Sequence, residues 1–415
     1  MTEKSRYWVP GRTFELVLKI GNKDFTNDIV ELTILTSITL PYQSFLFKMY
    51  IDPNDIILDK IYGQIPINLQ VILLATEAYP QEKTSFELMY LQSDLPFTQE
   101  IVNPETDIKQ KNRQIISFTA VPRQAYKTMN TYVNSIYSNM TVKDVITDLV
   151  QETGATIKYD TSNQNIEKID QILISPSTLY NNIKYINRTF GLFDGMPAIY
   201  CSHDNVVHIK NLTNKMKQAQ AFTVYNLATD ADVSKIIEKC SDGKHFYTRR
   251  NINTSYEGNS AFAFLAPKMI FVVKPRDRLE QRIEIELEDF IKRYGLISNS
   301  DKIFFDKNAI TTEKRVSIHK DHTGYDLSES FIRSNETKKI SKISDMMIVV
   351  ESSIKILNLL RVGESVEITS LTQTTNEISG RYILNTSEIR FNKIRDWETS
   401  ATLSLMRSNK TIIKQ

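Results

Sequence analysis

The sequence near the C-terminus runs Leu359-Leu-Arg-Val-Gly-Glu-Ser-Val-Glu-Ile-Thr-Ser370, then Gly380-Arg-Tyr-Ile-Leu-Asn-Thr-Ser-Glu-Ile-Arg-Phe391, and then Trp397-Glu-Thr-Ser-Ala-Thr-Leu-Ser-Leu-Met-Arg407. In the first segment Gly363 closes a loop, and apolar Val366 and Ile368 then alternate with polar residues. In the third segment Leu403 and Leu405 alternate with polar residues in the same way. A period of two between turn residues is typical of antiparallel strands with one solvated face. The stretch therefore predicts three connected strands of a small β-barrel.

A looser copy of this order occurs near the N-terminus. Tyr62–Leu74 places a glycine before a strand, Thr84–Leu91 supplies a second strand, and Gln114–Val121 supplies a third. A glycine before an alternating strand is common in β-meanders, so the similarity has little weight by itself. It favours a repeat of residues 63–121 by residues 363–406.

Length and composition indicate a folded protein of several domains. The chain has 415 residues, of which 41% are hydrophobic and 24% charged. This length predicts about two to four domains. Glycine is scarce at 12 residues, which argues against a glycine-rich fibre and against a phosphate-loop nucleotide enzyme. We expect a protein that is globular nearly throughout.

Charge and cysteine content exclude several further classes. The chain has 51 basic and 49 acidic residues, a balance unlike that of a dedicated nucleic-acid binder. Cys201 and Cys240 provide no framework for a disulfide scaffold. The first residues contain no apolar signal region, and no apolar run approaches the roughly 18 residues of a membrane span. We therefore expect synthesis and folding in a cytoplasm.

The N-terminal third predicts a first β-barrel. Apolar residues alternate from Phe14 to Ile20, the turn Gly21–Asp24 reverses the chain, and Ile29–Thr39 runs back. Ser44–Ile51 is the next strand. With the three strands already named, residues 1–122 are predicted to form an antiparallel barrel or sandwich of about six or seven strands, which ends near Pro122.

Beyond this boundary the period becomes helical, which predicts an α+β insert over residues 123–215. Thr141–Val150 has a capping threonine, an apolar stripe and Gly154 after its end. A second helix is predicted to start at Ser175–Thr178 and to stop at Gly191. After it, Ala198–Ser202 and Val206–Lys210 predict a hairpin around His203, Asp204 and Asn205.

The next region divides into a second barrel and an insertion within it. Ala221–Tyr225 and Met346–Glu351 read as strands. They assign residues 216–225 and 345–415 to a second β-barrel and residues 226–344 to an inserted peripheral region. Within the insertion, Arg276–Tyr294 predicts a helix, although the alternation Ile283-Glu-Ile-Glu286 leaves a strand possible. The fold class is thus α+β, mainly β.

Candidate chemistry is sparse. Cys201-x-His203-x4-His208 could be drawn as a metal site, but a fourth ligand at suitable spacing is missing, and ordinary strand and turn residues are the favoured interpretation. His319 and His322 are interpreted as residues of a solvated loop. We predict no catalytic, cofactor-binding or metal-ligating residue, and no cofactor.

An acidic run in the insertion offers a carboxylate pair such as glycosidases use. It consists of Glu280, Glu284, Glu286, Glu288 and Asp289. Basic residues surround this run on the predicted helix, so a salt-bridged solvent face explains it without catalysis. A hydrolase is the less favoured hypothesis.

The order of parts resembles a known family. The features that carry the resemblance are Ser44–Pro53, Thr141–Leu149, Ser177–Asn211 and Leu359–Arg407. In this order they resemble the baseplate central hub proteins of contractile-tailed bacteriophages, which are related to the hub part of type VI secretion spike proteins. The region from Ala221 to Ser344 does not match the family pattern.

The resemblance implies a role in assembly and not in catalysis. Hub proteins of this family form a homotrimer in which each copy contributes two similar barrels. The resulting pseudo-sixfold ring is a symmetry adaptor between the hexameric tail tube and the trimeric central spike. The implied partners are the spike protein, a tail tube or tube-initiator protein, baseplate wedge proteins, and phage DNA in transit through the lumen during genome ejection. The implied location is the virion tail baseplate, after assembly in the bacterial host cytoplasm. The alternative is a receptor- or glycan-binding tail protein.

Overall fold

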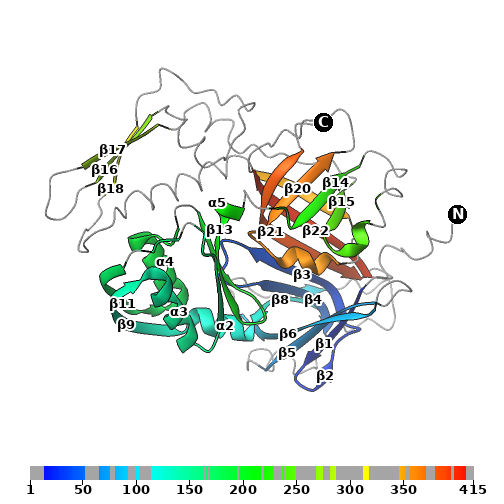
Figure 1. Ribbon diagram of the computed structural model, residues 1–415. Helices are drawn as coiled ribbons and strands as arrows, with labels where there is room; N and C mark the ends of the chain where they lie inside the picture. Colours follow the sequence, from blue (N-terminus) through cyan, green and yellow to red (C-terminus); the bar gives the residue numbers. More distant parts are fainter. Residues whose placement is uncertain are drawn as a thin grey trace.

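The computed structural model describes residues 14–51, 65–74, 80–91, 99–101, 114–162, 164–166, 168–193, 196–215, 219–227, 236, 239–248, 268–273, 281–286, 312–316, 345–351, 355–370, 379–393 and 397–407. Strands predominate, and 14 of them join in one sheet. The fold class expected from the sequence, α+β and mainly β, is confirmed. Figure 1 shows the sheet on one side of the molecule and the helical insert on the other.

The first part of the large sheet, here called the N-terminal module, is antiparallel throughout. Its strands are β1 Phe14–Ile20, β2 Lys23–Asp24, β3 Ile29–Ser37, β4 Ser44–Ile51, β5 Ile67–Leu73, β6 Glu82–Tyr90, β7 Gln99–Ile101 and β8 Gln114–Pro122. Alternation places one face in the core: Phe45, Phe47, Met49 and Ile51 of β4 are all buried, as predicted. Phe47 stacks on Phe118 with ring centroids 5.0 Å apart.

The second part, the C-terminal module, combines strands from distant parts of the chain. They are β14 Phe222–Asn226, β15 His245–Thr248, β19 Asp345–Glu351, β20 Ser365–Ser370, β21 Gly380–Lys393 and β22 Trp397–Arg407, with the short helices η3 Lys239–Asp242 and η4 Ile356–Leu360 beside them. Val366 and Ile368 are buried as their alternation predicted, and Gly363 has a φ of 75° in the loop before them. The two segments expected to enter this module, β14 and β19, do so.

The same order of neighbouring strands occurs in both modules. In chain order the strands are β1, β3, β4, β5, β6 and β8 in one module and β14, β15, β19, β20, β21 and β22 in the other. In each, the first strand pairs with the fourth, the fourth with the fifth, the fifth with the sixth, the sixth with the third, and the third with the second. The repeat expected from the sequence is therefore present in the pairing.

The modules differ in the direction of their first strand. β1 is antiparallel to β5, whereas β14 is parallel to β20. β14 also pairs in parallel with β15, so the pairings of the C-terminal module close into a ring. In the N-terminal module no described pairing joins β1 directly to β3.

A single long strand joins the two modules. β22 occupies one edge of β21 from Tyr382 to Lys393. The other edge is shared, because β20 pairs with Gly380–Ile383 and β3 pairs with Thr386–Asn392. Ile389 lies opposite Ile34 in this register, and both are fully buried. One hydrophobic cluster consequently runs through both modules.

The insert has its own hydrophobic cluster, and its first helix follows Pro122. Its elements are α2 Arg123–Asn130, β9 Tyr132–Thr141, α3 Val142–Glu152, β10 Thr156–Tyr159, β11 Lys168–Thr178, α4 Leu179–Phe190, β12 Pro197–Cys201, β13 Val206–Asn211 and α5 Leu212–Lys215. Thr141 caps α3 by accepting a hydrogen bond from the Asp144 amide at 3.2 Å, and Gly191 ends α4 with a φ of 71°. Both predicted helices and the predicted hairpin are confirmed.

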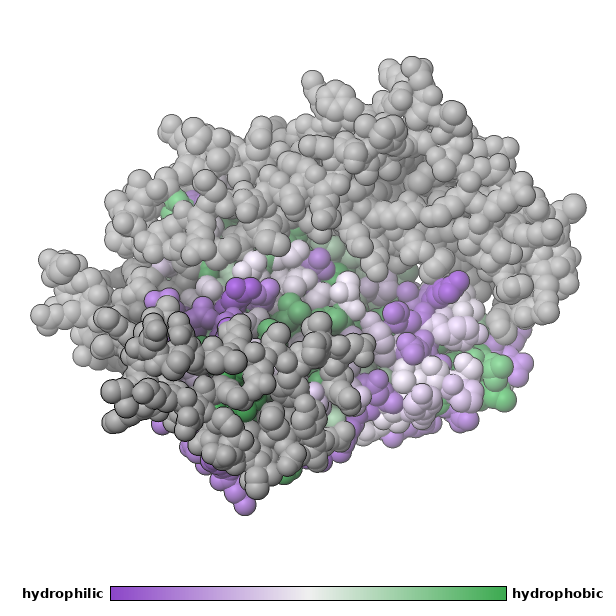
Figure 2. All heavy atoms as spheres, turned by 180° about the vertical axis from the view of Figure 1, so that it is seen from behind, coloured by the Kyte–Doolittle hydropathy of each residue, from purple (hydrophilic) through white to green (hydrophobic). Residues whose placement is uncertain are grey.

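The paired strands β9 and β11 were not anticipated from the sequence. Their inner face packs under α4, while Ile136 and Leu173 lie opposite each other on the outer face and are 64% and 54% exposed. Figure 2, seen from behind, shows hydrophobic residues at the right-hand edge of the described surface and also in its middle.

Two expectations for residues 226–344 are corrected. The predicted helix Arg276–Tyr294 is wrong where it is described, because Gln281–Glu286 forms the strand β17, paired with β16 Lys268–Val273. The alternation Ile283-Glu-Ile-Glu286 was the signal for it. β18 Thr312–Val316 completes this three-stranded sheet. In addition, β15 belongs to the large sheet and not to a peripheral insertion. The sequence did not predict this strand because four residues are too few to show an alternating pattern.

Candidate functional site

The β12–β13 hairpin of the insert contacts both modules. The Cys201 amide donates to the Pro41 carbonyl at 2.7 Å, which ties the hairpin to the N-terminal module. The Tyr200 hydroxyl donates to the Val362 carbonyl at 3.2 Å, and Lys210 Nζ donates to the same oxygen at 2.9 Å. These contacts fix the hairpin between the two modules.

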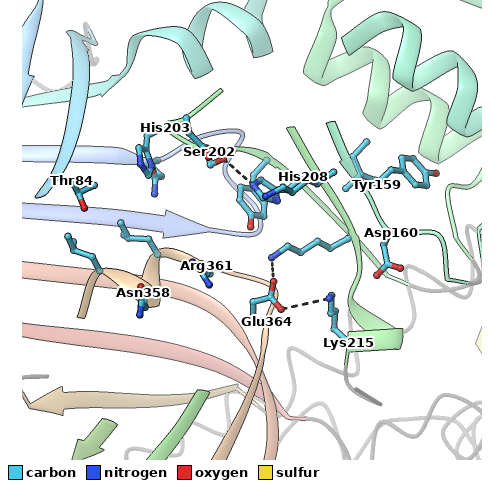
Figure 3. A pocket seen from close by; sticks show the side chains of 18 of the residues that line it. Thr84, Tyr159, Asp160, Ser202, His203, His208, Lys215, Asn358, Arg361 and Glu364 are labelled. Carbon is cyan, nitrogen blue, oxygen red and sulfur yellow. Dashed lines mark hydrogen bonds and ion pairs between the residues drawn. The ribbon is translucent and has the colours of Figure 1, made fainter. Parts of the chain in front are cut away.

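A polar cleft of about 790 Å³ lies where these three parts meet. Gln43 and Thr84 line it from the N-terminal module, residues 158–161, 200, 202–204, 208–210 and 215 from the insert, and residues 357, 358, 360, 361 and 364 from the C-terminal module. Figure 3 shows His203 and Thr84 at one end and Asp160 and Lys215 at the other. Because the lining comes from all three parts, the cleft exists only in the folded chain.

A buried ion pair crosses the middle of the cleft. Lys210 is only 8% exposed, and its Nζ lies 2.6 Å from Glu364 Oε1. Burial lowers the pKa of Lys210, and the nearby Glu364 carboxylate opposes this shift. Lys215 Nζ lies 3.9 Å from the other oxygen of Glu364. Glu364 therefore serves two lysines from the insert.

His208 is held as a neutral ring beside this pair. It stacks on Tyr200 with centroids 4.8 Å apart. Burial first, and then the charges of Lys210, Lys158 and Arg361, lower the pKa of His208 to about 4 against the opposing effect of Asp204. The cleft thus contains an uncharged imidazole at neutral pH.

Ser202 and His208 do not form an activated nucleophile. The Ser202 hydroxyl donates its hydrogen to the Asp204 carboxylate, so its oxygen accepts from His208 Nε2 at 3.0 Å. In this arrangement Nε2 carries the ring proton and cannot act as the general base for the hydroxyl. The carboxylate contacts the serine and not the histidine, the reverse of a catalytic triad.

Several polar atoms around the cleft are buried without a hydrogen-bond partner. They are Gln43 Oε1, Asp160 Oδ2, His203 Nδ1 and Tyr159 Oη. Burial lowers the pKa of His203 and raises that of Tyr159, so both rings are neutral near pH 7. The Tyr159 ring packs on Phe193 at 5.3 Å, within the insert core.

The residues weighed as a metal site from the sequence are placed differently. Cys201 is fully buried in the insert core, where burial raises the pKa of its thiol to about 12. Within the described part of the chain, no group of three His, Cys, Asp or Glu residues is arranged to hold a metal ion. His319 and His322 lie outside the described residues.

The acidic run is no longer explained as one face of a helix. Glu284 and Glu286 lie on β17, and Glu280, Glu288 and Asp289 lie outside the described residues.

The sequence did not predict the cleft. Lys210 and Glu364 are 154 positions apart, and no local pattern links them.

Comparison by sequence gives a partial match. The model of the Bacteriophage PBS1 gene 109 protein family matches residues 90–260. No curated protein matches the chain.

Among the described residues, no helix is both long and apolar enough to cross a membrane.

Comparison of folds defines the class: the chain has the fold of phage tail proteins. The tail protein from Neisseria meningitidis MC58 aligns with a TM-score of 0.56 and 10% identity over 95% of this chain and 97% of its own. The 43 kDa tail protein of prophage MuSo2 from Shewanella oneidensis also gives 0.56 and 10%, over 95% and 98%.

One chain of a PdpA–VgrG complex shares the fold as well. A chain of the lidded Francisella PdpA–VgrG complex aligns with a TM-score of 0.51 and 10% identity over 95% of this chain and 53% of that one. The resemblance recognised in the sequence is thus confirmed in the fold.

Proposed function

We propose that this chain is the structural baseplate hub of a contractile phage tail. In this role three copies form a pseudo-sixfold ring that joins the hexameric tail tube to the trimeric central spike and forms part of the DNA conduit. The tail-protein fold supports the general class. The finer assignment depends on how the chain repeats itself.

The observation that carries the proposal is the shared order of strands in the two modules. Five neighbour relations are the same in both. The modules lie edge to edge through β3 and β21 within one sheet. Three chains with two such modules each would offer six similar units, and rotation about a threefold axis would close them into a ring.

The proposed division of labour follows the modules. The domains are residues 1–122 as the first barrel, 123–215 as the insert, and 216–225 with 345–415 as the second barrel, to which β15 is added. The rest of 226–344 is assigned to the periphery. Function in this proposal lies in interfaces with the spike, the tube and the wedge proteins. The arrangement of Ser202 and His208 supports a role without catalysis.

The oligomeric state tests the proposal. We expect native mass spectrometry of the purified chain, alone or with its cognate spike protein, to give three copies. Class averages of that complex should show six similar densities around the axis. A chain that stays monomeric with the spike present contradicts the hub. A peripheral position of the chain in the particle would instead support the receptor-binding alternative.

A further inference from the structure

The polar cleft contains three buried atoms that need hydrogen-bond partners from outside the protein. Gln43 is 3% exposed and its Oε1 has no partner, Asp160 Oδ2 has none, and His203 Nδ1 has none. All three residues line the cleft. A buried polar atom without a hydrogen-bond partner destabilises the folded protein. Their concentration around one cavity points to a bound ligand.

The types of these atoms define what the ligand must supply. The amide oxygen Gln43 Oε1 and the carboxylate oxygen Asp160 Oδ2 accept hydrogen bonds, so the ligand must donate to them. His203 Nδ1 belongs to a neutral ring and either donates or accepts, depending on its tautomer. Hydroxyl groups meet all of these requirements, because each both donates and accepts.

The charged side chains of the cleft leave a surplus of one positive charge. Four cations, Lys158, Lys210, Lys215 and Arg361, line it against three carboxylates, Asp160, Asp204 and Glu364. Glu364 pairs with two of the lysines, at 2.6 and 3.9 Å, which leaves Lys158, Arg361, Asp160 and Asp204. None of these four forms an ion pair within 4 Å among the described residues. A surplus of one charge is small, and the unpartnered acceptors Gln43 Oε1 and Asp160 Oδ2 require a hydrogen-bond donor. These acceptors favour a neutral ligand with hydroxyl groups over a simple anion.

The shape of the cleft favours an elongated ligand. Figure 3 shows His203 and Asp160 at opposite ends, with His208 and the Glu364 ion pairs between them. The volume of about 790 Å³ lies within the range of about 300–1,000 Å³ that small-molecule pockets occupy.

We propose that the cleft binds a short neutral oligosaccharide, with Gln43 and Asp160 accepting hydrogen bonds from its hydroxyl groups and His203 contacting its other end. This inference does not depend on the hub proposal, since it uses the cleft of a single chain. A trimer that binds no sugar would support the hub proposal and contradict the saccharide site. A monomer that binds a sugar would do the opposite.

The test is ligand-observed saturation-transfer NMR on the full chain. The probes are maltotriose and N,N′-diacetylchitobiose at millimolar concentration, with inorganic phosphate as an anionic comparison. We expect saturation transfer to at least one saccharide. Asp160→Asn keeps the size of the side chain and an oxygen for the Ser162 contacts, while it replaces one acceptor with a donor. It should weaken binding about tenfold, the equivalent of about 1.4 kcal/mol.

Gln43→Ala provides a second variant, and Glu15→Gln is the matched control. Glu15 is an exposed carboxylate on β1 that does not line the cleft. We expect Gln43→Ala to weaken binding and Glu15→Gln to leave it unchanged, with unfolding temperatures measured for all. The inference is overturned by phosphate binding without saccharide binding, or by no binding of either probe, which would mean that water fills the cleft. Equal affinity of Asp160→Asn, Gln43→Ala and the unmodified chain would also overturn it.

Discussion

At the residue scale, the ionisable groups of the cleft owe their behaviour to burial. The sequence shows His208 and Lys210 on a predicted strand but not what faces them. In the folded chain His208 lies against Tyr200 and near Lys158, Lys210, Arg361 and Asp204. Desolvation is the largest influence on both His208 and Lys210, and it lowers both pKa values. The sequence positions of His208 and Lys210 do not reveal their burial or the charges near them.

Mild acid should destabilise the protein through His208. The unfolded chain takes up a proton with the ordinary pKa of 6.5, and the folded chain only near 4. The stability is therefore complete above pH 6.5 and is lost as the pH falls towards 4; at pH 5 the loss amounts to about 2 kcal/mol. Urea unfolding of the purified chain at pH 7.5 and pH 5 measures it.

His208→Gln is the companion variant for this measurement. Glutamine cannot take up the proton, so the variant should lose less stability than the unmodified chain between the two pH values. Some loss should remain, because the pKa of the buried His203 is also lowered. Identical pH dependence of the two proteins would show that His208 does not carry the effect.

At the element scale, local signals explain the helices better than the strands that accompany them. Thr141 and Thr178 cap α3 and α4, and the hydroxyl oxygen of each accepts a hydrogen bond from the backbone amide three residues further on. β11 was missed because its pairing with β9 is irregular. The register shifts between Ile174 and Ser177, on either side of Pro176.

Asn182 of α4 stabilises this irregular strand. The side chain is 1% exposed, and its Nδ2 lies 3.1 Å from the Val133 carbonyl, 3.2 Å from that of Ser175 and 3.2 Å from that of Ser177. Asn182→Ala leaves these carbonyls without this donor and should lower the free energy of unfolding by about 2–3 kcal/mol. Chemical denaturation measures the change.

The neighbouring Asn181 supplies the control for this variant. Its side chain is exposed on the same helix. Asn181→Ala should change stability by no more than about 0.5 kcal/mol. Equal losses for the two variants would mean that helix propensity, and not the bonds to the irregular strand, explains the effect.

At the scale of the whole molecule, β21 makes the two modules one structural unit. Its 14 residues pair with β20, β3 and β22, and one hydrophobic cluster includes side chains of both modules. The insert has a separate cluster. We therefore expect the modules to lose stability together and the insert to respond separately.

Ile34→Ala tests this coupling at the junction. The variant removes a fully buried side chain opposite Ile389 and should cost about 2–5 kcal/mol. Hydrogen exchange followed by mass spectrometry should show faster exchange in β4 of one module and in β22 of the other. The control Ile172→Ala leaves a cavity in the insert cluster, and its effect should be greatest there. An Ile34→Ala effect confined to the N-terminal module would contradict the shared unit.

The sequence by itself determined the fold class, most strands of the large sheet, the caps of α3 and α4, and the repeated order near the two ends. These features depend on the period of apolar residues and on turn residues within about a dozen positions, so the local sequence is enough to predict them. Short or irregular segments were not predicted correctly, as β15, β11 and the misread β17 show. Only the tertiary structure decided the parallel pairing of β14 with β20, the contact of β3 with β21, and the cleft. Each of these joins residues more than a hundred positions apart, and such pairings are selected by packing and burial in the folded chain.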